Sequence, residues 1–178
     1  MTETATDSQI VARCRTGDEA AWNELVERFS RYVYAICMQA FRLSPVDAED
    51  VFQEVFARVY QRLDSLRSDE AVRPWIAQLT RRLCIDSLRA SGRTAPTDPD
   101  TLEPPGVDDT LGRLDEAMSV RAGLEVIGEP CGELLDRFFC RDESYRTIGE
   151  ALSLPSGTIA SRISRCLGKL KSELEGRS

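Results

Sequence analysis

The sequence contains no histidine among its 178 residues, and its six cysteines form no Cys-x-x-Cys pair. The commonest general base and metal-binding side chain is therefore absent, and no Cys/His zinc site can be assembled. We expect no catalytic residue, no metal site and no other cofactor, and hence no enzyme. The cysteines are expected to be free, mostly buried thiols in a reducing cytoplasm. A redox switch formed by Cys131 and Cys140 is the alternative.

Long apolar runs are also missing. No stretch approaches the roughly 18 apolar residues that a membrane-spanning helix needs, so we expect no membrane insertion. The first twenty residues are rich in threonine and aspartate, without a basic start followed by an apolar stretch. No secretory signal is therefore expected, and the predicted location is the cytoplasm.

The charge is acidic overall, with a formal net value of −7, but it is unevenly distributed. Residues 71–90 carry four arginines against one aspartate, and residues 156–171 carry two arginines and two lysines without any acid. Phosphate binding depends on the local field rather than on the average charge. The two basic stretches therefore predict DNA contact at two places, and the acidic surface predicts a different, basic partner.

Apolar residues recur every three or four positions along most of the chain, which predicts helices and no strands. Residues 91–109 interrupt this pattern with four prolines, two glycines and five acids, a composition that favours no packed element. The predicted fold class is all-α: two small helical domains, residues 8–90 and 120–178, joined by an acidic, proline-rich flexible linker at 91–119.

Residues 144–171 predict a helix-turn-helix, with a short first helix, a turn at 153–155, and a second helix capped by Ser156. The second helix should bury an apolar stripe of Ile159, Ile163, Leu167, Leu170 and Leu174. Its candidate DNA-binding residues are Ser156, Thr158, Ser161, Arg162, Arg165 and Lys169. Arginine can donate two hydrogen bonds to guanine, and hydroxyl groups can contact phosphates. An ordinary helical hairpin with a solvated basic face is the alternative.

Residues 47–56, DAEDVFQEVF, predict a helix with one polar face formed by Asp47, Asp50, Gln53 and Glu54. Carboxylates that no nearby lysine offsets favour a surface kept for a basic protein partner. A two-metal carboxylate site would need Glu-x-x-His pairs, which this chain lacks. A solvated acidic face near a helix start is the remaining alternative.

Three segments together resemble bacterial sigma factors of the extracytoplasmic-function (ECF) group. DAEDVFQEVF resembles the helix of these proteins that binds core RNA polymerase. RPWIAQLTRRLCIDSLRA (73–90) resembles their promoter-recognition helix, and SYRTIGEALSLPSGTIASRISRCLGKL (144–170) resembles their −35-reading motif. The three motifs occur in the family's order, on both sides of a linker of suitable length.

The resemblance implies a role for each segment. The polymerase-binding residues are Asp47, Asp50, Gln53 and Glu54, which meet the clamp helices of the largest subunit. The −10 element is contacted by Arg73, Arg81, Arg82, Asp86 and Arg89, and the −35 element by the candidates of the second helix. Implied partners are core RNA polymerase, through clamp helices and flap, promoter DNA, and an anti-sigma factor.

The chain departs from the family pattern at four positions. Arg82 replaces the usual asparagine of the promoter-melting helix, and Ala160 replaces the usual lysine of the −35 helix. Ser153 replaces the glycine of the turn, and Glu143 replaces a leucine. A divergent ECF sigma factor is therefore expected. A stand-alone helix-turn-helix regulator that does not bind polymerase is the alternative.

Overall fold

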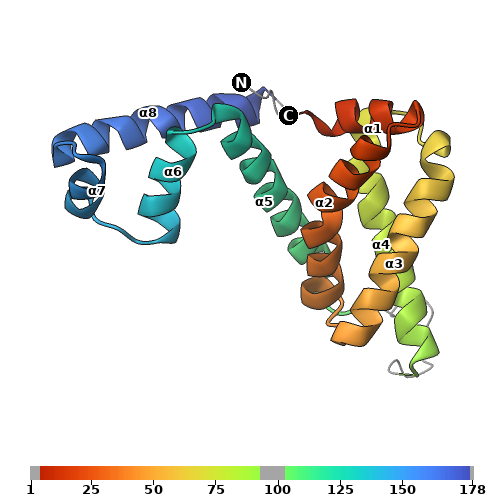
Figure 1. Cartoon of the computed structure of the whole chain (residues 1–178). Helices are drawn as coiled ribbons and strands as arrows, with labels where there is room; N and C mark the ends of the chain where they lie inside the picture. The colour runs from red at the N-terminus through yellow and green to blue at the C-terminus, as the bar shows by residue number, and fades with distance from the viewer. Residues whose placement is uncertain (1–4, 93–102, 177–178) are drawn as a thin grey trace. The chain divides into compact units, whose positions relative to one another are not determined.

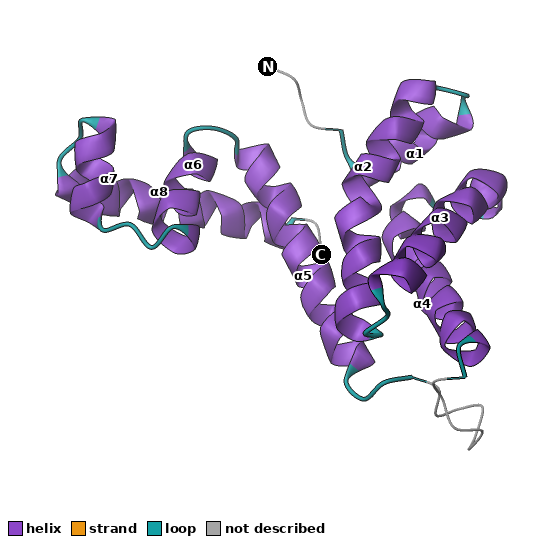
Figure 2. Ribbon diagram, turned by 60° about the horizontal axis from the view of Figure 1, so that its bottom comes forward, coloured by secondary structure: helices purple, strands orange, loops and turns teal. Residues whose placement is uncertain are grey.

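The computed structural model describes residues 5–92 and 103–176, and within them it contains eight α-helices and no strand (Figures 1 and 2). The all-α prediction is therefore confirmed for this part of the chain. The helices are α1 (Asp7–Arg15), α2 (Glu19–Ala35), α3 (Pro45–Arg62), α4 (Val72–Ala90), α5 (Val107–Ile127), α6 (Cys131–Leu135), α7 (Tyr145–Leu152) and α8 (Ser156–Glu175). Short π-helical or 3-10 segments are η1 (Ile36–Ala40), η2 (Leu63–Ser65), η3 (Asp69–Ala71) and η5 (Asp136–Cys140). Each described helix is too short or too polar to cross a bilayer.

The N-terminal unit, residues 5–115, is built around α2, α3 and α4, with α1 packed against them (Figure 1). Asp18 caps α2 by accepting hydrogen bonds from the backbone N–H groups of Ala20 and Ala21 at 2.9 and 3.2 Å. Ser44 caps α3, and Pro45 is the first residue of this helix. The core of the unit includes the fully buried Ile10, Val11, Leu25, Phe29, Val33, Ile36, Val55, Val59, Val72 and Ile76.

Helix α1 was not predicted. Its start is a capping box: Gln9 N donates to Thr6 Oγ1 at 3.3 Å, and Thr6 N donates to Gln9 Oε1 at 2.8 Å. The Thr-x-x-Gln spacing is a recognised helix-start pattern. Ile10 and Val11 then pack into the core.

The C-terminal unit begins at Glu116 and packs α6, α7, α8 and the second half of α5 around a small core. Gly123 of α5 lies so close to α8 that an added Cβ would come within 2.7 Å of Leu170. The buried cluster of this core is Cys131, Leu134, Leu135, Ile148, Ile159, Ile163 and Cys166.

The linker predicted at 91–119 is partly helical. Its residues 93–102 lie outside the described residues, but α5 begins at Val107, so the prediction of an unpacked linker is wrong from there onward. Val107 and Leu111 stand one turn apart, and two aspartates occupy the first turn, where carboxylates favour a helix start. The many prolines and acids of residues 91–109 masked this helix-start signal in the sequence.

Candidate nucleic-acid and partner interfaces

The polar face of α3 is largely open to solvent. Asp50, Gln53 and Glu54 are exposed, whereas Asp47 is half-buried beside the N-cap, where Ser44 Oγ donates to Asp47 Oδ2 at 2.7 Å. No lysine offsets this face, but Arg58 Nε donates to Glu54 Oε1 at 2.6 Å. Such exposed ion pairs contribute little free energy, so the pair between Arg58 and Glu54 does not prevent a basic partner from binding this face.

An aromatic cluster that sequence analysis missed borders this acidic face. The rings of Tyr34 and Phe52 stack with centroids 4.5 Å apart, and Phe56 follows Phe52 at 4.8 Å. The Tyr34 hydroxyl donates to Glu49, and this hydrogen bond raises the pKa of Tyr34 to about 12 and lowers that of Glu49. The face therefore combines carboxylates with partly exposed rings. Its signal in the sequence is the helical spacing of Phe52 and Phe56.

Two of the arginines expected to contact DNA are held by carboxylates. Arg73 Nη2 lies 3.3 Å from Asp7 Oδ2 of α1, and its side chain is 21% exposed. Arg81 is 22% exposed and is bound by Glu103 and Asp108. The hydrogen bond with Glu103 is the main cause that raises the pKa of Arg81 above its ordinary value. Both cations are therefore engaged within the N-terminal unit.

The other three residues of the predicted −10 set lie on the surface of α4. Arg82, Asp86 and Arg89 are all exposed. Arg89 Nη1 lies 3.7 Å from Asp86 Oδ1, a loose i,i+3 pair that a phosphate group can displace at little cost. Arg82 and Arg89 are therefore accessible to a nucleic-acid backbone.

Trp75 is half-buried and borders a small cavity of about 110 Å³ between α3 and α4. The cavity is also lined by Arg62, Gln78, Leu79 and Arg82. Within the described residues, neither of these arginines takes part in an ion pair. Trp75 is therefore only partly accessible to solvent, and it lies beside Arg62 and Arg82.

The predicted helix-turn-helix consists of α7, a three-residue turn and α8. Ser144 caps α7 by accepting a hydrogen bond from Thr147 N at 3.1 Å. Ser153 ends α7 in the left-handed conformation, with φ of 56°, where the family pattern has glycine. Leu154 folds back over Gly149, and a Cβ on Gly149 would meet Leu154 O at 2.4 Å. The turn is therefore tight enough to require glycine at 149.

The basic face of α8 is open to solvent. Ser156, Ser161, Arg162, Arg165 and Lys169 are exposed, and Thr158 is half-buried. The prediction that Ser156 caps α8 is wrong: Pro155 is the N-cap, because its carbonyl accepts hydrogen bonds from Thr158 N and Ile159 N at 2.9 and 3.2 Å. Ser156 is instead the first helical residue.

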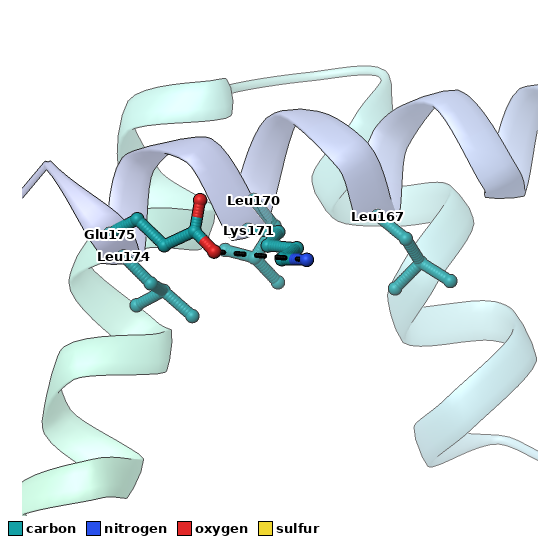
Figure 3. A pocket seen from close by; sticks show the side chains of 5 residues that line it. All are labelled: Leu167, Leu170, Lys171, Leu174 and Glu175. Carbon is teal, nitrogen blue, oxygen red and sulfur yellow. Dashed lines mark ion pairs between the residues drawn. The ribbon is translucent and has the colours of Figure 1, made fainter.

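The apolar stripe of α8 differs from the prediction at its C-terminal end. Ile159 and Ile163 are buried, but Leu167 is 39% exposed, and Cys166 is buried instead. Leucine side chains on this part of α8 point to one side and border an open hollow of about 360 Å³ (Figure 3). The hollow is lined by Leu167, Leu170, Lys171, Leu174 and Glu175.

A disulfide joins Cys131 of α6 to Cys166 of α8. The prediction of free thiols is therefore wrong for these two residues, and so is the alternative pairing of Cys131 with Cys140, which is exposed and free. Burial raises the pKa of the free Cys14 thiol to about 11. The bonded sulfurs come from residues 35 positions apart, a spacing that carries no sequence signal.

Cys37 and Cys84 form a second close pair inside the N-terminal unit, but their sulfurs are 3.7 Å apart and unbonded. The hydrogen bond between them, together with burial, raises the pKa of Cys84 well above its ordinary value. The Cys84 thiol therefore stays protonated, as expected for a buried structural cysteine.

The helices that carry the acidic face and the arginines of α4 match a known protein family. Residues 25–94 match the family model of sigma-70 region 2. This range begins within α2 and contains the whole of α3 and α4. The acidic face of α3 and the arginines of α4 therefore both lie within the segment that matches this model.

The whole chain is similar to curated ECF RNA polymerase sigma-E factors. The protein from Haemophilus influenzae is 26% identical over 98% of both chains. The proteins from Escherichia coli K12 and Salmonella typhimurium are each 29% identical, over 93% of this chain and 92% of theirs. The chain is thus similar to ECF sigma-E factors over nearly its full length, and residues 25–94 match the model of sigma-70 region 2.

A solved structure described as "Structure of CnrH in complex with the cytosolic domain of CnrY" matches 97% of this chain and 99% of its own. The sequence identity is 20% and the TM-score is 0.43.

Proposed function

We propose that the chain is an ECF-type sigma factor that binds core RNA polymerase and directs promoter recognition, DNA melting and transcription initiation. The observation that carries the proposal is the similarity to sigma-E factors over 92–98% of both chains. Such a match includes both units and the segment between them. A likeness confined to a helix-turn-helix would leave the N-terminal unit unexplained.

In this proposal, residues 8–90 bind polymerase and the −10 element, and residues 120–178 bind the −35 element. The open acidic face of α3 supports polymerase binding, since its exposed carboxylates suit a basic partner helix. The surface arginines of α4 and the basic face of α8 support nucleic-acid binding. DNA melting needs no chemical step, because binding the unpaired strand better than the duplex is sufficient.

Regulation and location extend the same proposal. An anti-sigma factor is the regulator that the family resemblance implies, and an exposed acidic and aromatic face on α3 is a suitable surface for one. The protein would act in the cytoplasm, where polymerase and promoter DNA are found.

Co-elution with bacterial core RNA polymerase on a sizing column tests the proposal. The wild type should co-elute, and the variant Asp50→Lys/Glu54→Lys should not, because two cations would face a basic partner. The matched control is Glu27→Lys/Glu116→Lys, which makes the same charge change at exposed sites away from this face. Failure of the wild type to bind at low salt would refute the proposal and favour a stand-alone helix-turn-helix regulator.

A further inference from the structure

Residues 103–115, here named the acidic strap, belong to the N-terminal unit and are joined to α4 by ion pairs with Arg81. Glu103 accepts hydrogen bonds from Nε and Nη2 of Arg81, and Asp108 Oδ1 accepts from Nη1 at 2.9 Å. All three nitrogens of the guanidinium therefore donate to strap carboxylates. The strap reaches Arg81 from more than twenty positions along the chain.

Two further contacts hold the strap in place independently of Arg81. Val107 is only 3% exposed, so its side chain is packed rather than solvated. At the other end, the Tyr32 hydroxyl of α2 donates a hydrogen bond to Asp115. Burial and this hydrogen bond raise the pKa of Tyr32 above its ordinary value. The strap is thus anchored at its beginning, its middle and its end.

The strap reduces the number of hydrogen-bond donors and the positive charge that α4 presents to a polyanion. A phosphate group would need the same N–H groups of Arg81 that the two carboxylates occupy. The strap also carries four acids, Glu103, Asp108, Asp109 and Asp115, against the single base Arg113. It therefore lowers the positive potential beside an α4 surface whose basic stretch is the densest of the N-terminal unit.

We propose that the acidic strap is an autoinhibitory contact that competes with single-stranded DNA for Arg81 of α4. The inference rests on the proposed function in one respect, namely that the ligand of α4 is the displaced promoter strand. In the free protein the strap occupies Arg81 and weakens DNA binding. DNA gains this arginine only when Glu103 and Asp108 leave it, so the two events are coupled.

The test is binding of a fluorescein-labelled single-stranded oligonucleotide to the full chain at low salt, followed by fluorescence anisotropy. The variant Glu103→Gln/Asp108→Asn should bind about five- to tenfold more tightly than the wild type, a typical coupling between two sites. The control Asp109→Asn/Glu116→Gln removes the same charge at exposed positions without ion pairs in the described residues. It should change the affinity by less than about twofold, because neither of these carboxylates holds an N–H group of Arg81.

The gain in oligonucleotide affinity must depend on Arg81. Adding Arg81→Gln to Glu103→Gln/Asp108→Asn should return the affinity to the wild-type value or below, and circular dichroism checks that each variant is folded. An equal gain in the control would overturn the proposal, since net charge alone would explain it. No measurable binding by the freed variant would also overturn it, because releasing Arg81 would then create no nucleic-acid site.

The same proteins are passed over the sizing column with core polymerase. Co-elution without any gain in oligonucleotide binding would refute the strap and leave the sigma-factor proposal standing. A gain that depends on Arg81 without co-elution would do the reverse. The two proposals therefore fail separately.

Discussion

Reduction of the Cys131–Cys166 disulfide should unfold the C-terminal unit or bring it close to unfolding. The bond closes a loop between residues 35 positions apart. In the chain-entropy model a loop of this length contributes about 4 kcal/mol at 25 °C. A helical unit of about 60 residues has a total stability of only a few kcal/mol, so the loss is comparable to the whole.

The distribution of tryptophan makes this effect separable from the rest of the molecule. Both tryptophans, Trp22 and Trp75, lie in the N-terminal unit. Tryptophan fluorescence therefore reports unfolding of that unit alone, whereas far-ultraviolet circular dichroism reports helices of both units. Dithiothreitol should move part of the dichroism transition in urea to lower concentration and leave the fluorescence transition in place.

Two controls and a thiol count define the outcome. The variant Cys131→Ala/Cys166→Ala should match the reduced wild type without any reductant, and Cys140→Ser should behave as the oxidised wild type. In denaturant without reductant, four thiols should react, because Cys14, Cys37, Cys84 and Cys140 are free. Six reactive thiols in air-oxidised protein, or a dichroism transition that ignores dithiothreitol, would contradict the reasoning.

Four further substitutions test the helix-turn-helix. Ser153→Gly should raise the stability of the C-terminal unit by about 0.5–1 kcal/mol in urea unfolding, because residue 153 is left-handed; a loss would contradict the turn geometry. Gly149→Ala should cost about 1–3 kcal/mol in the same assay, since the new Cβ would collide with a backbone carbonyl. Arg162→Ala and Arg165→Ala should each weaken promoter binding by reconstituted holoenzyme, and a contact to phosphate should lower the salt slope by about one. The exposed Arg146→Ala on α7 serves as the matched control.

Local chemistry was predictable wherever neighbouring residues decide the structure. Serine followed by proline is a helix-start pattern, and Ser44 and Pro45 begin α3. The turn at 153–155 separates α7 from α8 at the predicted place. The start of α8 was misplaced by one residue because a serine is a good cap in general, whereas here the Pro155 carbonyl begins the helix. Errors of this size are inherent in helix boundaries.

Contacts between distant residues could not be predicted from the same reasoning. A disulfide across 35 residues depends on α6 meeting α8 in the folded core, and nothing in the spacing of the cysteines indicates it. Arg73 was grouped with the DNA-binding arginines by its position on α4, yet it faces Asp7 of a helix that was not predicted. Because α1 was not predicted, the sequence did not indicate that Asp7 is the partner of Arg73.

The acidic strap shows why composition alone misjudges such a segment. Prolines and acids indicated that residues 91–119 bury too little apolar surface to offset the entropy of ordering. That estimate treats the segment as an isolated chain. Once α4 is folded, Arg81 supplies an electrostatic partner, Tyr32 supplies a hydrogen bond, and Val107 gains a buried position. The acidic residues that predicted a solvated linker therefore attach the strap to α4, and they offset the positive charge of that helix.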